Sequence, residues 1–190
     1  MKRTIFIIIL LLIAGTSWGF SAYQFKKHEA DLVIQLESVF MKLALPYHIA
    51  RLSLQDPDTK LHIPIQGLLK RDLRDTWGDA RSEGRTHQGV DMFAKRGTPI
   101  FSATDGFVVR TGTNELGGII VFVMGKGGVR YYYAHLDSIA KGIEVGKEVT
   151  TDTVLGFVGN TGNAVGTPPH LHFGMYRNGP ENPFELLETR

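Results

Sequence analysis

The part of the chain after Leu61 consists of short apolar runs separated by turn residues, and this pattern constrains the fold more than any other feature. Most of the 22 glycines lie in the same part, where they supply tight turns. Six runs have the β-branched and aromatic content of strands: Ile100 to Ala103, Phe107 to Thr111, Ile119 to Met124, Val129 to Ala134, Val154 to Val158 and His170 to Tyr176. The pattern predicts a mainly β domain of antiparallel strands over residues 62–187.

The N-terminus has the features of a membrane-targeting segment. Lys2 and Arg3 precede residues 4–25, which carry no charge. A span of that length can cross a bilayer as a helix, and the two basic residues favour a cytoplasmic N-terminus with the rest of the chain outside. We therefore predict a signal anchor over residues 1–25 that attaches the protein to the inner membrane. A cleaved signal peptide is the alternative.

Residues 26–61 are expected to form a helical stalk or linker between the anchor and the β domain. Apolar residues recur there at helical spacing up to about Ser53: Leu32, Leu36, Val39 and Leu43. Pro46 is expected to interrupt this helix, because proline lacks the amide proton that a helix requires. The sequence Asp56-Pro57-Asp58 predicts a turn at the end of the segment.

Composition excludes sites built from cysteine and argues against binding of nucleic acid. The chain has no cysteine, so disulfides and thiolate metal ligands are absent, and any metal site must use His, Asp or Glu. The 21 basic and 19 acidic residues give a net charge of only +2. This balance argues against a nucleic-acid-binding protein, which would carry a concentrated basic face.

Histidines mark two places where a metal ion could bind. In His170-Leu171-His172, strand geometry places both imidazoles on one face and the leucine on the other. His87 and Asp91 would lie about 13 Å apart in an extended chain, at ~3.3 Å per residue. Because ligands of one zinc ion lie within about 2.2 Å of it, this segment must bend, and Gly89 provides the conformational freedom to do so.

A third histidine, His135, ends an aromatic run, and the order of all three motifs resembles that of a known family. The chain contains His-x-x-x-Asp from His87, then Tyr-x-His-Leu around His135, then His-Leu-His-Phe from His170. This arrangement resembles the lysostaphin-type zinc endopeptidases, also called the LytM family, over about residues 64–186. Two segments between the motifs support the resemblance: Gly97-Thr98-Pro99-Ile100 and Gly156-Phe157-Val158-Gly159-Asn160-Thr161-Gly162.

The resemblance implies a fold, a cofactor and a role for each matching residue. The fold would be an antiparallel β-sheet that forms a groove, preceded by the N-terminal helical segment. His87, Asp91 and His172 would bind one Zn²⁺ per chain, which leaves a fourth coordination position open, as in catalytic zinc sites. His170 and His135 would assist catalysis, with His170 favoured as the base and His135 as the group that stabilises the oxyanion.

The implied function is hydrolysis of amide bonds in the stem peptides or cross-links of peptidoglycan, in the cell envelope and outside the cytoplasm. The anchor favours a periplasmic enzyme acting on a D-Ala cross-link. The alternative is a non-enzymatic regulator of other wall hydrolases, which would have lost metal ligands; a third possibility is an interaction protein that uses the helix at residues 26–53. Four segments are expected to border the site: Arg81 to Thr86, Asn114 to Gly118, the stretch after His135, and Asn160 to Pro169.

Overall fold

The computed structural model describes residues 2–189, and the side chains of residues 24, 26–82 and 84–189. The chain forms two compact units that divide between Phe40 and Met41. The first unit consists of the N-terminal part of helix α1 (Lys2–Ser53), and the second contains the end of that helix together with every strand of the described chain.

Helix α1 continues through Pro46, so the predicted interruption was wrong. Proline deprives the helix of one amide donor and leaves the carbonyl group of Lys42 without its usual partner. Both Pro46 and Lys42 are exposed, so water can satisfy that carbonyl group. Among the described residues, no helix has a stretch both long and apolar enough to span a bilayer. The predicted anchor at residues 4–25 lies outside the described side chains except for Gln24.

The last turns of α1 belong to the second unit because their side chains pack on it. Leu52 is buried. The ring of His48 stacks on that of Phe107, with centroids 4.3 Å apart, and the backbone of Met41 lies against Gly146. The compact unit therefore begins N-terminal to residue 62, the predicted start of the β domain.

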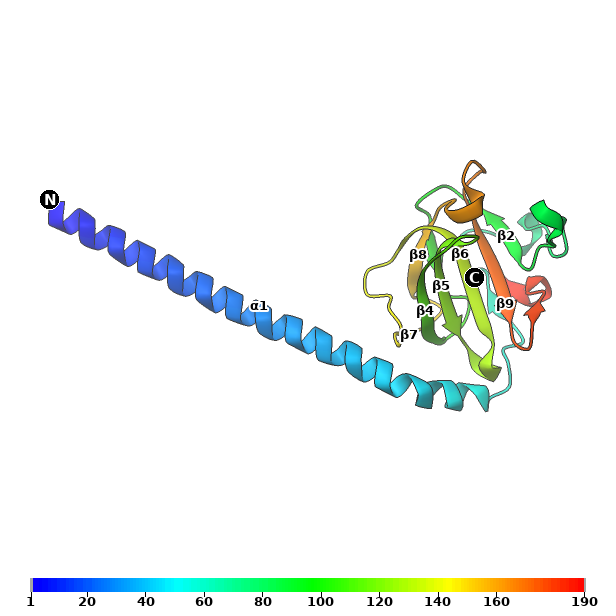
Figure 1. The fold of residues 1–190 in the computed structure, drawn as a ribbon, viewed down its shortest axis with the longest axis horizontal. Helices are drawn as coiled ribbons and strands as arrows, with labels where there is room; N and C mark the ends of the chain where they lie inside the picture. The colour runs from blue at the N-terminus through cyan, green and yellow to red at the C-terminus, as the bar shows by residue number, and fades with distance from the viewer. Residues whose placement is uncertain (1, 190) are drawn as a thin grey trace. The chain divides into compact units, whose positions relative to one another are not determined.

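The second unit is built on a nine-stranded sheet whose paired strands are all antiparallel. Figure 1 shows its long strands side by side. The hydrogen-bonded order is β10-β9-β6-β5-β4-β7, with β2 also paired to β9, and β8 joining β3 to β6. The mainly β, antiparallel fold predicted from the sequence is confirmed.

All six predicted strands are present, and the structure adds several short ones. The strands of the sheet are β2 (Val90–Phe93), β3 (Pro99–Phe101), β4 (Gly106–Asn114), β5 (Gly118–Met124), β6 (Arg130–Ile139), β7 (Glu148–Val149), β8 (Val154–Val158), β9 (His170–Tyr176) and β10 (Pro180–Glu181). A separate parallel pair joins β1 (Leu61–His62) to β11 (Leu187–Glu188). Five short 3-10 helices lie in the connections of the described chain: Lys70–Asp72, Ser82–Gly84, Lys126–Gly128, Gly162–Ala164 and Phe184–Leu186.

Strand β6 changes partner along its length. Its first half, up to Ala134, pairs with β9, and its second half, from Leu136, pairs with β8. His135 lies at the point of change with a φ of 63°, the left-handed region that non-glycine residues rarely adopt. The register with β5 also shifts there by one residue, which is the signature of a β-bulge.

The bulge determines which way His135 points. Tyr131 and Tyr133 alternate into the core, so a regular strand would direct residue 135 into the core as well. The extra residue breaks this alternation: Leu136 takes the next core position, and His135 lines the same cavity as Tyr132. A local irregularity of the backbone therefore brings a polar side chain to the functional face of the sheet.

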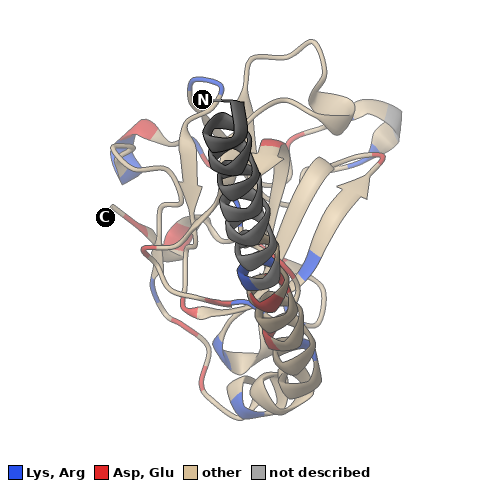
Figure 2. Ribbon diagram, turned by 90° about the vertical axis from the view of Figure 1, so that its left-hand side faces the viewer, with Lys and Arg blue, Asp and Glu red and all other residues tan. Residues whose placement is uncertain are grey.

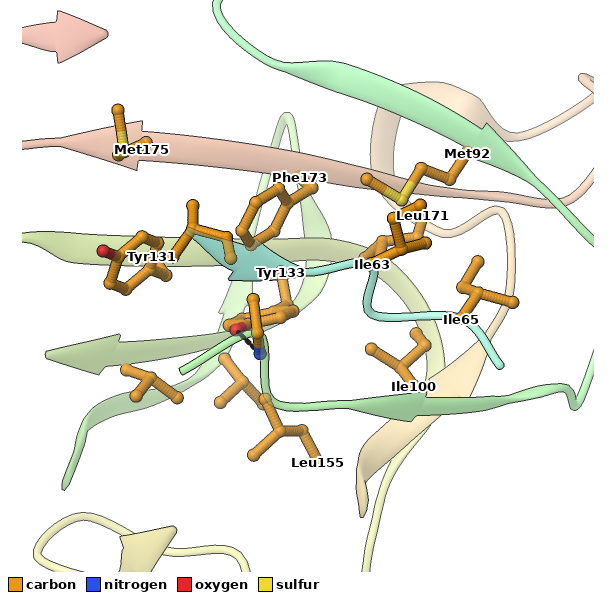
Figure 3. Packing of buried hydrophobic residues seen from close by; sticks show 14 of the residues in the cluster. Ile63, Ile65, Met92, Ile100, Tyr131, Tyr133, Leu155, Leu171, Phe173 and Met175 are labelled. Atoms are coloured by element: carbon orange, nitrogen blue, oxygen red, sulfur yellow. Dashed lines mark hydrogen bonds between the residues drawn. The ribbon is translucent and has the colours of Figure 1, made fainter. Parts of the chain in front are cut away.

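The core on the other face of the sheet is mostly aliphatic and contains the fully buried aromatic side chains of Tyr131, Tyr133 and Phe173 (Figure 3). Phe173 on β9 lies beside Tyr131 and Tyr133 on β6, with ring centroids 6.1 Å and 5.3 Å away. The Tyr133 hydroxyl accepts a hydrogen bond from the backbone amide of Ala103, which satisfies its polar atom inside the core. Leu171 is fully buried on this face, so β9 directs its histidines the opposite way.

Charged residues of both signs are mixed over the part of the β domain seen in Figure 2. Several form ion pairs at the surface, among them Lys60 with Glu188 and Arg96 with Asp137. This distribution agrees with the near-neutral balance of the sequence.

Candidate metal centre and active site

Strands β2, β6 and β9 bring the site together through their register. Asp91 on β2 pairs with His172 on β9, and His172 pairs on its other side with Ala134 on β6. Because His170 and His172 are two residues apart on one strand, they share a face, as predicted. The residue after Ala134 is His135, which the bulge turns toward the same face.

His87, Asp91 and His172 converge on one point. The Nε2 atom of His87 lies 2.8 Å from Nδ1 of His172 and 3.0 Å from Oδ1 of Asp91. Nδ1 of His172 lies 3.2 Å from the same oxygen. Two ligand atoms bound 2.0–2.1 Å from a tetrahedral zinc ion are roughly 3.3–3.4 Å apart. The three predicted ligands therefore have nearly the spacing that one zinc ion requires.

Hydrogen bonds around the ligands leave acceptor atoms facing this point. Nδ1 of His87 lies 2.7 Å from the carbonyl oxygen of Thr76, which can only accept, so this nitrogen carries the proton and Nε2 presents its lone pair. Burial lowers the pKa of His172, which favours its neutral form. Acceptor atoms that face one another repel unless a proton or a cation lies between them. The donor set therefore fits a divalent metal ion.

Asp91 is ionised, and hydrogen bonds to its carboxylate and its backbone amide fix its position. Burial raises the pKa of its carboxyl group, but interactions with His172 and His87 outweigh this effect and hold the pKa well below its usual range. Its backbone amide donates to the hydroxyl oxygen of Thr76 at 3.1 Å. Its second carboxylate oxygen, Oδ2, accepts a hydrogen bond from Arg81. Thr76 thus orients two of the three predicted ligands.

Gly89 provides space rather than the conformational freedom that the sequence suggested. Its φ is not in the left-handed region. A Cβ atom at this position would lie 2.6 Å from Cε1 of His172 and 2.6 Å from the carbonyl oxygen of Phe173. A larger residue would displace His172, so the close approach of β2 to β9 requires glycine here.

His135 and His170 lie beside the three ligands. Their ring centroids are 5.0 Å apart, and that of His135 is 5.9 Å from that of His172. In each ring Nδ1 lies 2.9 Å from a backbone carbonyl oxygen, that of Thr161 for His135 and that of Pro168 for His170. Nδ1 must therefore donate, and Nε2 of the neutral ring is left as an acceptor. Burial, followed by the proximity of His172, lowers the pKa of His135 to about 4.

All five predicted site residues line one cavity of about 1050 Å³. Its base is formed by side chains of β6 and β9, including Tyr132 and Tyr176. Burial raises the pKa of Tyr132, so its hydroxyl group stays protonated, and this group accepts a hydrogen bond from Asn114. A cavity of this size slightly exceeds the range of about 300–1,000 Å³ for small-molecule pockets, so it has room for a segment of peptide.

Three of the four segments expected to border the site do so. Residues of Arg81 to Thr86, Asn114 to Gly118 and Asn160 to Pro169 line the cavity. The stretch after His135 does not, because Leu136 turns into the core and the strand then continues along β8. No sequence pattern indicated Thr76, or Arg81 as a partner of Asp91.

Comparisons with known proteins agree with this geometry. The model of Peptidase family M23 matches residues 85–183. The L-Ala--D-Glu endopeptidase of Bacillus subtilis is 38% identical over 160 residues, which are 80% of this chain and 47% of that protein. The chain thus spans about half the length of this relative.

Two solved structures share the fold. Csd3 of Helicobacter pylori aligns with a TM-score of 0.55 and 32% identity, over 69% of this chain and 34% of that one. The catalytic domain of lysostaphin from Staphylococcus simulans aligns with a TM-score of 0.53 and 28% identity, over 60% of this chain and 91% of that domain.

Proposed function

Since the chain belongs to peptidase family M23, we propose that it is a zinc-dependent endopeptidase that hydrolyses amide bonds in the stem peptides or cross-links of peptidoglycan. The observation that carries the proposal is the convergence of His87, Asp91 and His172 on one point beside two further histidines. The relative from Bacillus subtilis is named an L-Ala--D-Glu endopeptidase.

The proposed mechanism assigns one task to each group of residues. His87, Asp91 and His172 would hold the zinc ion, which when bound would acidify water and polarise a carbonyl group. His170 accepts a proton at Nε2, the ring nitrogen that its bond to Pro168 leaves available. The role proposed for His135 is to stabilise the oxyanion that develops on the substrate. This role requires Nε2 to take up a proton from solvent first, because the neutral ring donates from Nδ1 to Thr161 and presents only a lone pair at Nε2.

Zymography on purified peptidoglycan tests this function directly. We expect the full chain to clear the substrate, a zinc chelator to abolish clearing, and added Zn²⁺ to restore it, because all three proposed ligands come from the protein. Mass spectrometry of the products then identifies the bond: a new amino terminus on D-Glu indicates cleavage after L-Ala, and one on the diamino acid indicates cleavage of a D-Ala cross-link. Clearing that is insensitive to the chelator would contradict the zinc site.

The alternative function, a regulator without activity of its own, is disfavoured by the completeness of the site. All three proposed ligands and both flanking histidines are present and line one cavity. A regulator would show no clearing by itself in the zymogram and would increase clearing by another wall hydrolase.

We propose further that the protein acts outside the cytoplasm, attached to the inner membrane through residues 4–25. The support is the pair Lys2-Arg3 before an uncharged span of bilayer length. Cell fractionation with N-terminal sequencing separates the two parts of this proposal. We expect the protein in the membrane fraction with Met1 or Lys2 at its start. Recovery from the cytosol would contradict export, whereas a shortened periplasmic form would contradict only the anchor.

A further inference from the structure

The two carboxylate oxygens of Asp91 have different partners. Oδ1 faces Nε2 of His87 at 3.0 Å and Nδ1 of His172 at 3.2 Å. Oδ2 accepts a hydrogen bond from Nη2 of Arg81 at 2.5 Å. The side chain of Asp91 is 7% exposed and that of Arg81 is 36% exposed, so the ion pair joins a buried carboxylate to a partly exposed arginine.

A short hairpin fixes Arg81 relative to the predicted ligand His87. The backbone amide of Arg81 donates to the carbonyl oxygen of Arg85, and that of His87 donates to the carbonyl oxygen of Asp79, both at 2.9 Å. Ala80 and Thr86 form a β-bridge between these two bonds. One hairpin therefore carries a predicted ligand at one end and the partner of a second ligand near its turn.

The position of Arg81 places it between two cavities. Arg81 and Asp91 line both the main cavity and a smaller one of about 250 Å³, which is also bordered by Leu68, Leu73 and Phe93. The guanidinium group thus contacts Asp91 on the side away from the two histidine ligands. A guanidinium group at this position fixes the orientation of the Asp91 carboxylate relative to the two histidine ligands.

We propose that Arg81 is a positioning residue of the metal centre. Its hydrogen bond occupies Oδ2 of Asp91, so that only Oδ1 is available to the metal. A carboxylate can bind a cation through one oxygen or through both. Chelation by both would add a fourth protein atom, whereas catalytic zinc sites keep that position for water or substrate. The charge-assisted hydrogen bond from Arg81 opposes such chelation. This inference rests on the proposed function, because it assumes a metal held by these three residues.

Cobalt(II) provides a readout that does not depend on activity, because its visible absorption weakens as its coordination number rises. We expect the full chain with Arg81→Met to retain one cobalt ion and to absorb less per ion than the parent, since Oδ2 becomes free to bind. The kcat of its zinc form should fall about 10- to 100-fold, the range for residues that orient metal ligands. Arg71→Met is the matched control, because that side chain is 80% exposed and pairs with Asp72.

Two kinds of result would count against the inference. A cobalt spectrum of Arg81→Met identical to that of the parent would overturn it. If activity were also lost while the spectrum stayed unchanged, Arg81 would contact the substrate instead. A parent protein that binds no cobalt would refute the metal centre itself. Should Arg81→Met fail to fold, judged by circular dichroism, Arg81→Gln gives the same comparison, because its shorter side chain loses the charge.

Discussion

His172→Ala is expected to lose both its zinc and its activity. The residue supplies Nδ1, which lies 2.8 Å from Nε2 of His87 and 3.2 Å from Oδ1 of Asp91. Its removal leaves two ligands where a catalytic zinc site has three. Loss of a residue that only orients a ligand already costs about 10- to 100-fold in metal affinity, so loss of a ligand should cost more. Metal analysis of the purified full chain should show one zinc ion in the parent and almost none in the variant.

A histidine outside the site provides the matched control. His62 is exposed on β1, away from the cavity-lining residues, so His62→Ala should retain one zinc ion and parental activity. Asp91→Ala should behave like His172→Ala, because Oδ1 faces both histidine ligands. If His172→Ala retained a full complement of zinc, the assignment of the three ligands would be wrong.

His170→Ala and His135→Ala are expected to bind zinc and yet lose most of their activity. Neither residue is among the three converging ligands, but both line the cavity next to them. Groups that transfer a proton or stabilise charge in the transition state contribute about 10²- to 10⁴-fold to the rate. The measurement is kcat on a defined muropeptide, together with the zinc content of each variant.

The zinc content separates a catalytic role from a structural one. A variant that has lost its zinc would owe its inactivity to the metal, and the residue would then belong with the ligands. Parental rates in both variants would refute the mechanism. If only one variant is slow, that histidine carries the proton transfer and the other does not.

The strands and the shared face of His170 and His172 could be predicted because both follow from local periodicity. The alternation in His170-Leu171-His172 directed two imidazoles to one face, and the structure has this arrangement. The resemblance to a family indicated that His87 and Asp91 belong with them. Strand β2 was missed because it has only four residues and follows Gly89 directly.

The remaining features depend on contacts that no local pattern encodes. Thr76 holds His87 through a backbone carbonyl group, which every residue type possesses, so no sequence pattern indicated this contact. The orientation of His135 depends on a bulge, whereas simple alternation would have placed it in the core with Tyr133. Pro46 was expected to interrupt the helix because the intrinsic preference of proline was known, but the exposure of this residue was not.

The change of partner along β6 has a consequence for how proteins with this sheet can diverge and be engineered. The loop at residues 160–169 leaves β8 and returns in β9, and a bridge between Gly159 and His170 closes its base. Because β8 and β9 are each held to a different half of β6, residues inserted between Thr161 and Pro168 would not shift His170 relative to His135 and would leave the carbonyl groups that orient the two rings in place. A shift of one residue within a strand, in contrast, would reverse the face of every side chain. Loop length can therefore vary to suit new peptides while the reactive groups stay in place, which makes this loop the natural target for redesigning substrate preference.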